Sequence, residues 1–173
     1  MIRDVVSVRD RSRIHYRRLG QGPGMVLLHG YPQTGHMWRK VMPALAERFT
    51  VVAPDLRGYG DSDRPAAGYD KRTMAADVAD VPGFEDYRAG ATIDLEHDGA
   101  DRDTKVAVPT LVLWGEAGGR RPQAPDMLAV WKERCVHVEG RAVLGSGHFI
   151  PEEQPAAVID AILRFVGAPE RKA

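Results

Sequence analysis

The sequence predicts an α/β fold in which a mostly parallel sheet is flanked by helices. Short unalternated apolar runs, typical of strands that are buried on both faces, recur along the chain. Stretches with apolar residues at helical spacing separate these runs, and such alternation of strand and helix indicates a parallel sheet. The length of 173 residues allows one domain with a hydrophobic core of its own.

The first part of the chain is expected to form a hairpin, two buried strands and two helices. In chain order, the strands are expected over residues 5–8, 12–17, 25–28 and 50–53, and the helices over residues 35–49 and 73–81. Pro43 favours a bend or break in the first helix, because proline has no amide hydrogen to donate. The loop over residues 54–65 is long for a plain connector, and long loops in compact domains tend to be functional.

The later part of the chain returns to strands and helices after a charged stretch with weak periodicity. Strands are expected over residues 110–114 and 136–143, and helices over residues 84–103 (weak), 125–134 and 151–166. One domain is therefore expected over residues 1–167. Its halves, 1–80 and 84–167, meet near residues 78–84, and residues 168–173 are expected to be a tail.

Composition excludes several classes of function. Acidic and basic side chains balance at 24 each, so no net field attracts the chain to nucleic acid or to an anionic membrane. No apolar run reaches the roughly 18 residues of a membrane span, and the expected location is cytoplasmic. Cys135 is the only cysteine, and no histidine or acidic spacing matches a metal site. Neither a metal nor a cofactor is expected.

Four motifs then carry a resemblance to a known family. They are HGYPQTGHMW over residues 29–38, PDLRGYGDSDRP over residues 54–65, LVLWGE over residues 111–116 and GSGHFIPEE over residues 145–153. Together they resemble the α/β-hydrolases. The loop sequences, together with EDYRAGATIDLEHD before the late strand, are most similar to those of the haloacetate (fluoroacetate) dehalogenases, and epoxide hydrolases are the next most similar. The resemblance implies hydrolysis of a small molecule such as a haloacid.

The resemblance assigns catalytic roles near the ends of the late strands. His148 takes the position of the family's general base, a task for which imidazole is suited near neutral pH. Otherwise, His148 is a loop histidine that caps the following helix. Glu116 follows the late strand and could orient His148 as its acid partner, or be a solvated loop glutamate. Asp55 and Arg57 are expected to hold the turn of the long loop by hydrogen bonds to the backbone.

The turn after the third expected strand is the candidate oxyanion site. The resemblance implies that Tyr31 offers its backbone N–H there, within the turn that His29 and Gly30 begin. The alternative is that this turn only shapes a tight exit from the strand. Trp38 is expected to pack in the core or to line the pocket for the substrate.

The nucleophile of the family is missing from the sequence. Members carry it on an elbow of the form Gly-x-Asp-x-Gly or Gly-x-Ser-x-Gly, and neither pattern occurs in the 173 residues. By family order, the elbow belongs after the helix over residues 73–81. Two central strands, the elbow and a helical lid, on the order of 100 residues, are therefore expected to be deleted there.

Such a deletion leaves the sheet with two open edges. Direct pairing of residues 25–28 with residues 110–114 in one sheet of six strands is the favoured solution, and an edge-to-edge homodimer is the alternative. Three functions remain open. The chain is an inactive or weakly active relative of the dehalogenases, a weak hydrolase that uses His148 as a base toward water, or a non-enzymatic dimer or interaction module.

Overall fold

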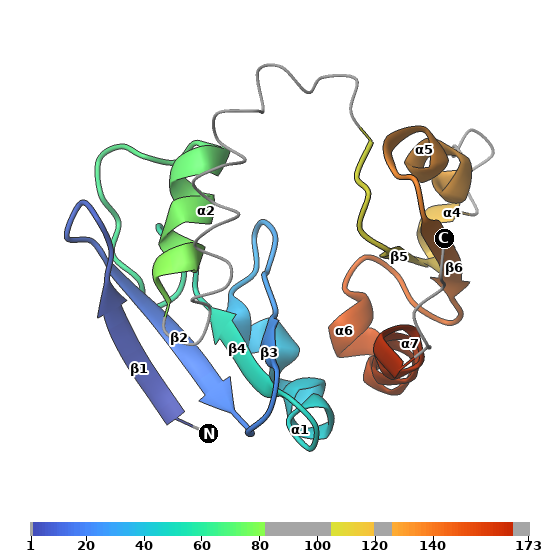
Figure 1. The fold of residues 1–173 in the computed structure, drawn as a ribbon, viewed down its shortest axis with the longest axis horizontal. Helices are drawn as coiled ribbons and strands as arrows, with labels where there is room; N and C mark the ends of the chain where they lie inside the picture. The colour runs from blue at the N-terminus through green and yellow to red at the C-terminus, as the bar shows by residue number, and fades with distance from the viewer. Residues whose placement is uncertain (1, 82–104, 120–125, 168–173) are drawn as a thin grey trace. The chain divides into compact units, whose positions relative to one another are not determined.

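The computed structural model describes residues 2–81, 105–119 and 126–167. These residues belong to two compact units, Met1–Asp101 and Arg102–Ala173, which are called unit 1 and unit 2 below (Figure 1). The weak helix expected over residues 84–103 and the tail over residues 168–173 lie outside the described residues. The expectation that both units form one domain stays a prediction.

Unit 1 contains a mixed sheet of four strands. The strands are β1 (Ile2–Ser7), β2 (Arg13–Leu19), β3 (Gly24–Val26) and β4 (Thr50–Pro54). They lie in the order β1-β2-β4-β3, so β1 and β3 are the outer strands. Strands β1 and β2 form the expected antiparallel hairpin, β2 and β4 are also antiparallel, and β3 runs parallel to β4. All five residues of β4 are buried, as its unbroken apolar run predicts.

The helices of unit 1 are short. They are the 3₁₀ helix η1 (Gly35–Lys40), α1 (Met42–Leu45) and α2 (Lys71–Asp80). The single helix expected over residues 35–49 is divided at Val41, and Pro43 lies in the first turn of α1, where its missing amide hydrogen costs nothing. The carboxylate of Asp70 caps α2 by accepting a hydrogen bond from the Thr73 N–H at 3.0 Å. One buried apolar cluster joins the sheet to the end of α2, and it consists of Val8, Ile14, Tyr16, Val52 and Val81.

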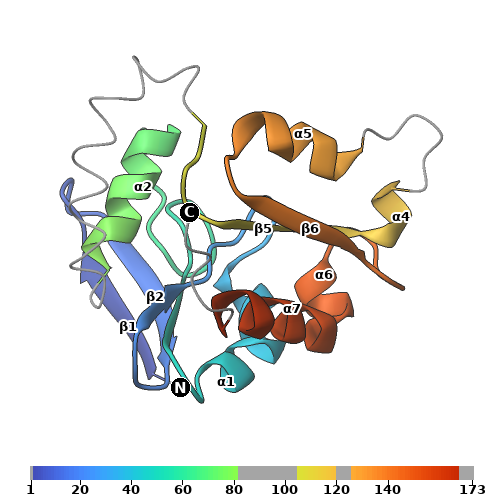
Figure 2. The ribbon, with the colours of Figure 1, turned by 45° about the vertical axis from the view of Figure 1, so that its right-hand side comes forward.

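Unit 2 contains two parallel strands with helices on both sides. The elements are β5 (Thr110–Gly115), α4 (Glu116–Gly119), α5 (Met127–Arg134), β6 (Val138–Val143), α6 (Ile150–Glu153) and α7 (Pro155–Gly167). Helix α5 lies on one side of the strand pair, and α6 and α7 lie on the other (Figure 2). The helix expected over residues 151–166 is divided at Gln154, because Pro155 cannot donate a hydrogen bond to the preceding turn and instead begins a new helix.

The strand pairs in the described residues are of both kinds. Two of the four pairs are antiparallel and two are parallel, and helices flank the strands as expected. The expected pairing of residues 25–28 with residues 110–114 would join unit 1 to unit 2, and it stays a prediction. Strand β3 has three residues and ends at Val26, so it is shorter than the apolar run over residues 25–28 predicted.

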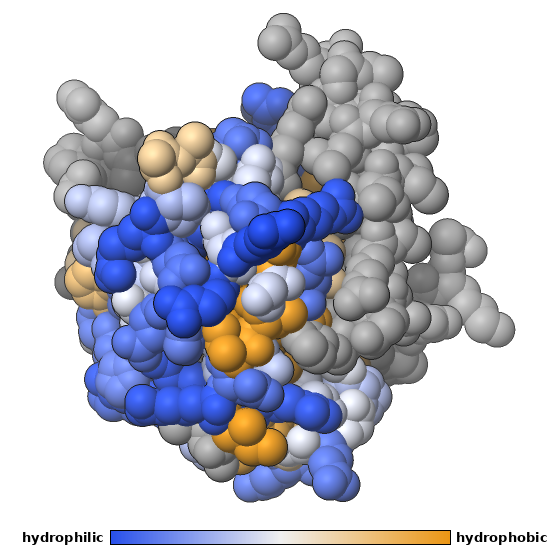
Figure 3. All heavy atoms as spheres, turned by 90° about the vertical axis from the view of Figure 1, so that its left-hand side faces the viewer, coloured by the Kyte–Doolittle hydropathy of each residue, from blue (hydrophilic) through white to orange (hydrophobic). Residues whose placement is uncertain are grey.

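The outer strand β1 lies on a hydrophilic face of unit 1. Figure 3 shows mainly hydrophilic residues on this face, with small separate hydrophobic patches. Ile2 and Val5 of β1 are 60% and 43% exposed, and the charged residues Arg3 and Asp4 lie between them in the strand. Charges on an outer strand oppose pairing with another chain. Within the described part of the chain, no helix combines the length and the apolar character that crossing a membrane requires.

Candidate functional site

The candidate site residues fall into two groups, one in each unit. Unit 2 carries His148 and Glu116, and unit 1 carries His29, Gly30, Tyr31 and Trp38. In the described residues, histidine, cysteine and acidic side chains do not gather into groups of three or more that could hold a metal ion.

His148 lies in the loop that connects β6 to α6. Its side chain is exposed, and its ring contacts the Phe149 ring edge-on, with 5.0 Å between the ring centroids. This loop, residues 144–149, is called the His148 loop below. Exposure leaves the imidazole accessible to water and to small molecules, as a general base requires.

The first half of the His148 loop is held by hydrogen bonds to the backbone. The Gly145 N–H donates to the Glu116 carboxylate at 2.9 Å, and the Ser146 hydroxyl donates to the Val143 carbonyl at 2.7 Å. Gly145 has a φ of +68°, which glycine adopts at low cost. Glu116 therefore binds the backbone of the loop that carries His148, and its role as the acid partner of His148 stays a prediction.

The second half of the loop is held by Glu153, a residue that the sequence analysis did not identify. Its two carboxylate oxygens accept hydrogen bonds from the Gly147 N–H and from the Phe149 N–H, the latter at 2.9 Å. The Gly147 amide, followed by the Phe149 amide, lowers the pKa of the Glu153 carboxyl, and the charge of His148 acts in the same direction. The available signal was a glutamate in the first turn of the helix that follows the histidine.

His29 is buried and joins two loops of unit 1. Its side chain is 5% exposed, its Nε2 accepts a hydrogen bond from the Leu56 N–H at 2.9 Å, and its Nδ1 lies 3.1 Å from the Gly30 carbonyl oxygen. These partners assign the proton to Nδ1. Burial lowers the pKa of His29, which favours the neutral ring. In this structure His29 connects the turn after β3 to the loop after β4.

Tyr31 and Gly30 lie on the open side of the same turn. Tyr31 is 82% exposed, and its N–H is paired with no acceptor among the described residues. A methyl group built on Gly30 would meet no atom within 4 Å. An N–H with open space beside it is what an oxyanion donor requires.

Trp38 lies in η1 and is only half-buried, yet its indole Nε1 is buried and has no hydrogen-bond partner in the described part of the chain. Both readings of Trp38 from the sequence, core packing and pocket lining, remain predictions. Such an unpaired buried donor is uncommon in folded proteins.

Asp55 organises the long loop after β4. Its carboxylate is 1% exposed and accepts hydrogen bonds from the Gly35 N–H at 2.8 Å and the Asp61 N–H at 3.2 Å. The prediction that Asp55 holds this turn through backbone hydrogen bonds is thus confirmed. Asp55 also pairs with the Arg17 guanidinium at 2.9 Å, a contact between residues 38 positions apart that local sequence does not reveal.

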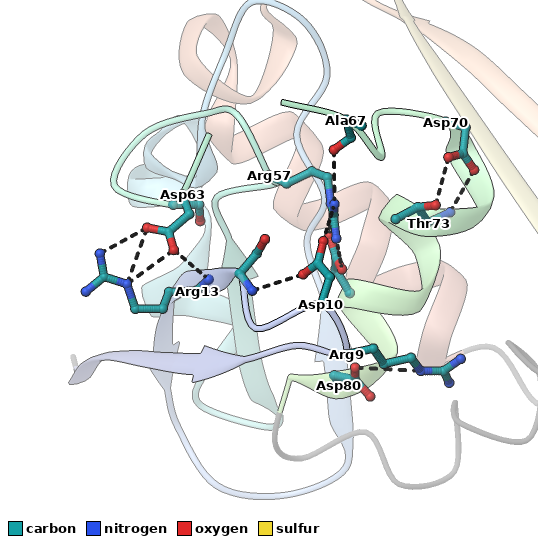
Figure 4. A network of polar contacts seen from close by, with 12 residues as sticks. Arg9, Asp10, Arg13, Arg57, Asp63, Ala67, Asp70, Thr73 and Asp80 are labelled. Atoms are coloured by element: carbon teal, nitrogen blue, oxygen red, sulfur yellow. Dashed lines mark hydrogen bonds and ion pairs between the residues drawn. The ribbon is translucent and has the colours of Figure 1, made fainter. Parts of the chain in front are cut away.

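Arg57 mainly binds carboxylates rather than the backbone. Its side chain is 1% exposed, and it donates hydrogen bonds to Asp77 and, at 2.9 Å, to Asp10 (Figure 4). The hydrogen bonds to Asp77 are the main cause that raises the pKa of Arg57, against the opposing effect of burial. A cavity of about 480 Å³ adjoins this cluster, and its lining consists of Arg9, Asp10, Arg57, Asp70, Thr73, Ala76 and Asp77.

Known proteins share both the sequence and the fold. Residues 23–86 match the family model described as alpha/beta hydrolase fold. The soluble epoxide hydrolase of Corynebacterium sp. (strain C12) is 61% identical over 69 residues, which cover 40% of this chain and 24% of that protein. The fluoroacetate dehalogenase of Burkholderia sp is 39% identical over 116 residues, which cover 56% of this chain and 38% of that protein.

The likeness in three dimensions is more extensive than the likeness to these two sequences. The crystal structure of ALR0039 from Nostoc sp PCC 7120 superposes with a TM-score of 0.81 at 29% identity, covering 97% of this chain and 98% of that one. The chain spans less than half the length of the curated relatives named above. The family model over residues 23–86 and the superposition with ALR0039 show that the chain has an α/β-hydrolase fold.

Proposed function

We propose that the chain is a relative of the haloacetate dehalogenases that is inactive, or weakly active, toward small haloacids because it has no nucleophile. One observation carries the proposal: neither form of the nucleophile elbow occurs in the sequence between α2 and β5, where family order puts it. The names of the epoxide hydrolase and dehalogenase relatives support the choice of small-molecule hydrolysis.

Loss of the elbow removes the covalent step. A nucleophilic carboxylate or hydroxyl divides one difficult displacement into two easier ones, and the histidine base then activates the water that completes the second. Without the nucleophile, no covalent intermediate forms on the chain. The histidine base is then left to act on water, which must attack the substrate directly.

A weak hydrolase is the second candidate, and the intact His148 loop favours it. His148 is exposed, and its loop is held by the Glu116 and Glu153 carboxylates. In this candidate, His148 takes a proton from the water molecule that attacks the ester carbonyl, and the alcohol part of the ester leaves. No covalent intermediate is involved.

The test compares halide release and ester hydrolysis in matched variants. Fluoride or chloride release from fluoroacetate and chloroacetate, and hydrolysis of p-nitrophenyl acetate, are measured on the purified protein, on His148→Ala and on His137→Ala. His137 is another exposed histidine of unit 2, so its variant corrects for ester hydrolysis by any surface imidazole.

The outcomes separate the two candidates. Turnover that disappears in His148→Ala but persists in His137→Ala contradicts the inactive reading and supports the weak hydrolase. Equal background rates in all three proteins, each with the circular dichroism of a folded chain, support the loss of activity.

We also propose a homodimer that forms through the outer strand β3. Strand β3 ends the sheet of unit 1, Leu28 beyond it is 48% exposed, and the opposite outer strand β1 is protected by charges. A second copy of the same edge is a matching partner, since most homo-oligomers are symmetric. Sedimentation equilibrium tests this: Leu28→Lys is expected to abolish a dimer, and a wild-type monomer at every concentration contradicts it.

A further inference from the structure

Glu153 holds the backbone on both sides of His148. Its Oε2 accepts the hydrogen bond of Gly147, the residue before the histidine, and its Oε1 accepts that of Phe149, the residue after it. One carboxylate therefore fixes the peptide groups that join residues 146–147 and 148–149, and the Cα atom that carries the imidazole lies between them. We infer that Glu153 is a positioning residue for His148, and this inference rests on the proposed role of His148 as the base.

Contacts from other elements restrict the same loop, so Glu153 has a defined task within it. The Ser146 carbonyl accepts a hydrogen bond from the Ala117 N–H at 3.1 Å, and Gln154 donates to the Gly145 carbonyl at 3.3 Å. These contacts, like that of Glu116, fix the loop before His148. After His148, the Phe149 carbonyl accepts hydrogen bonds from the Glu152 and Glu153 N–H groups, and the Glu153 carboxylate binds the Phe149 N–H, so this side chain contacts the backbone on both sides of the histidine.

The positions of the two N–H donors fit a carboxylate on a side chain of the length of glutamate. Both oxygens are used by N–H donors, so a glutamine could accept only one of the two hydrogen bonds and would turn its own N–H₂ group toward the other. An aspartate is shorter by one methylene and could not span both amides from the same backbone position. A methyl group on Gly147 would lie 3.2 Å from Oε2 of Glu153, so the carboxylate fits closely against this loop.

The test is spectroscopic and is made on the full chain at neutral pH. Amide ¹H–¹⁵N spectra and the imidazole proton resonances are compared between wild type, Glu153→Gln, Glu153→Asp and the charge control Glu133→Gln. Glu133 is exposed on α5 and makes no interaction with another described residue, so it matches the charge change alone.

In Glu153→Gln, the Phe149 and Gly147 amide protons are expected to move upfield, and at least one to exchange about tenfold faster or more, because a charge-assisted hydrogen bond is lost. The His148 ring resonances are expected to shift or broaden, while those of His137 stay in place. Glu153→Asp, which keeps the charge, is expected to give the same pattern. Unchanged amides, or His148 resonances that respond equally to Glu133→Gln, overturn the inference.

Two controls keep the result decisive. Unaltered β6 amide shifts are required as proof that unit 2 remains folded; if Glu153→Gln loses them, Glu153→Asp alone decides. The spectra can be recorded whether or not the protein is active. If no activity is found, the proposed role of His148 as a base is contradicted, but the positioning of His148 by Glu153 can still be tested. Conversely, turnover that depends on His148 together with unaltered resonances in Glu153→Gln would support the role of His148 as a base. The same result would contradict the positioning role of Glu153.

Discussion

Replacement of Asp77 by alanine tests how much unit 1 depends on the pairing of Arg57. The two side chains are 1% and 5% exposed, so both charges lie almost wholly outside water. Asp77 accepts hydrogen bonds from two nitrogens of the guanidinium, at Nε and, at 2.7 Å, at Nη2. Alanine would leave the buried cation with Asp10, whose side chain is 45% exposed, as its remaining carboxylate partner among the described residues.

The expected cost is large because a buried charge loses a partner. Removing one member of a buried ion pair typically costs about 3–5 kcal/mol, more than the pair itself contributes relative to apolar residues. Since each 1.4 kcal/mol is about tenfold in an equilibrium constant, amides that exchange only through unfolding of unit 1 should exchange about a hundredfold faster or more. Hydrogen exchange of the buried strand β4, read by mass spectrometry, reports on this unit alone.

Asp80→Ala is the matched control on the same helix. Asp80 lies 4.0 Å from the Nε of Arg9, and these side chains are 22% and 61% exposed, so their ion pair contributes only about 0–1 kcal/mol. Exchange of the β4 amides should therefore rise less than about fivefold in this variant. If Asp77→Ala increased exchange no more than Asp80→Ala does, the reasoning from burial of Arg57 would be refuted.

Two further predictions concern the loops that carry the candidate site. Gly115→Ala is expected to destabilise unit 2 by about 1–3 kcal/mol, because its new methyl group would meet the Gly147 carbonyl oxygen at 1.7 Å. In Gly30→Ala, by contrast, the new methyl group meets nothing within 4 Å. This second variant should change the stability of unit 1 little. Faster exchange of β6 amides in Gly115→Ala checks the first change, and unaltered β4 exchange in Gly30→Ala checks the second. Burial lowers the pKa of His29, so the unfolded chain binds a proton that the folded unit does not. This stabilisation is complete above the ordinary pKa of 6.5 and is lost as the pH falls through the folded pKa; an NMR titration midpoint of His29 at or above 6.5 would contradict it.

Local patterns in the sequence predicted most elements but not their long-range partners. The fully buried strand β4 and the hairpin of β1 and β2 follow from apolar runs and alternation. Pro155 is a local signal for the division between α6 and α7, but the helical periodicity of the apolar residues favoured one continuous helix. The partners of Arg57 and Asp55 lie 20 and 38 residues away, so the fold alone brings them together.

The same distinction applies to the candidate site. His148 and Glu116 were identified through motifs, and the structure joins Glu116 to the loop of His148 by a hydrogen bond to Gly145. Glu153 was missed because its partners are backbone amides, and a glutamate in the first turn of a helix does not by itself show which amides it binds. His29 was assigned to the oxyanion turn, whereas burial and the Leu56 amide give it a structural contact that no motif specifies.

The share of the rate acceleration that a nucleophile would supply decides which assay can detect the activity that remains without it. General acid–base catalysis contributes about 10²- to 10⁴-fold, whereas complete enzymes accelerate reactions about 10⁶- to 10¹⁷-fold. A site that has His148 but no nucleophile is therefore limited to roughly the first range. Against the strong carbon–fluorine bond of fluoroacetate, such an acceleration would leave a rate too slow to measure. With an activated ester, the same acceleration would give a rate above the background hydrolysis. Hydrolysis of p-nitrophenyl acetate is therefore a more sensitive test of whether His148 acts as a base than turnover of the relatives' natural substrate class.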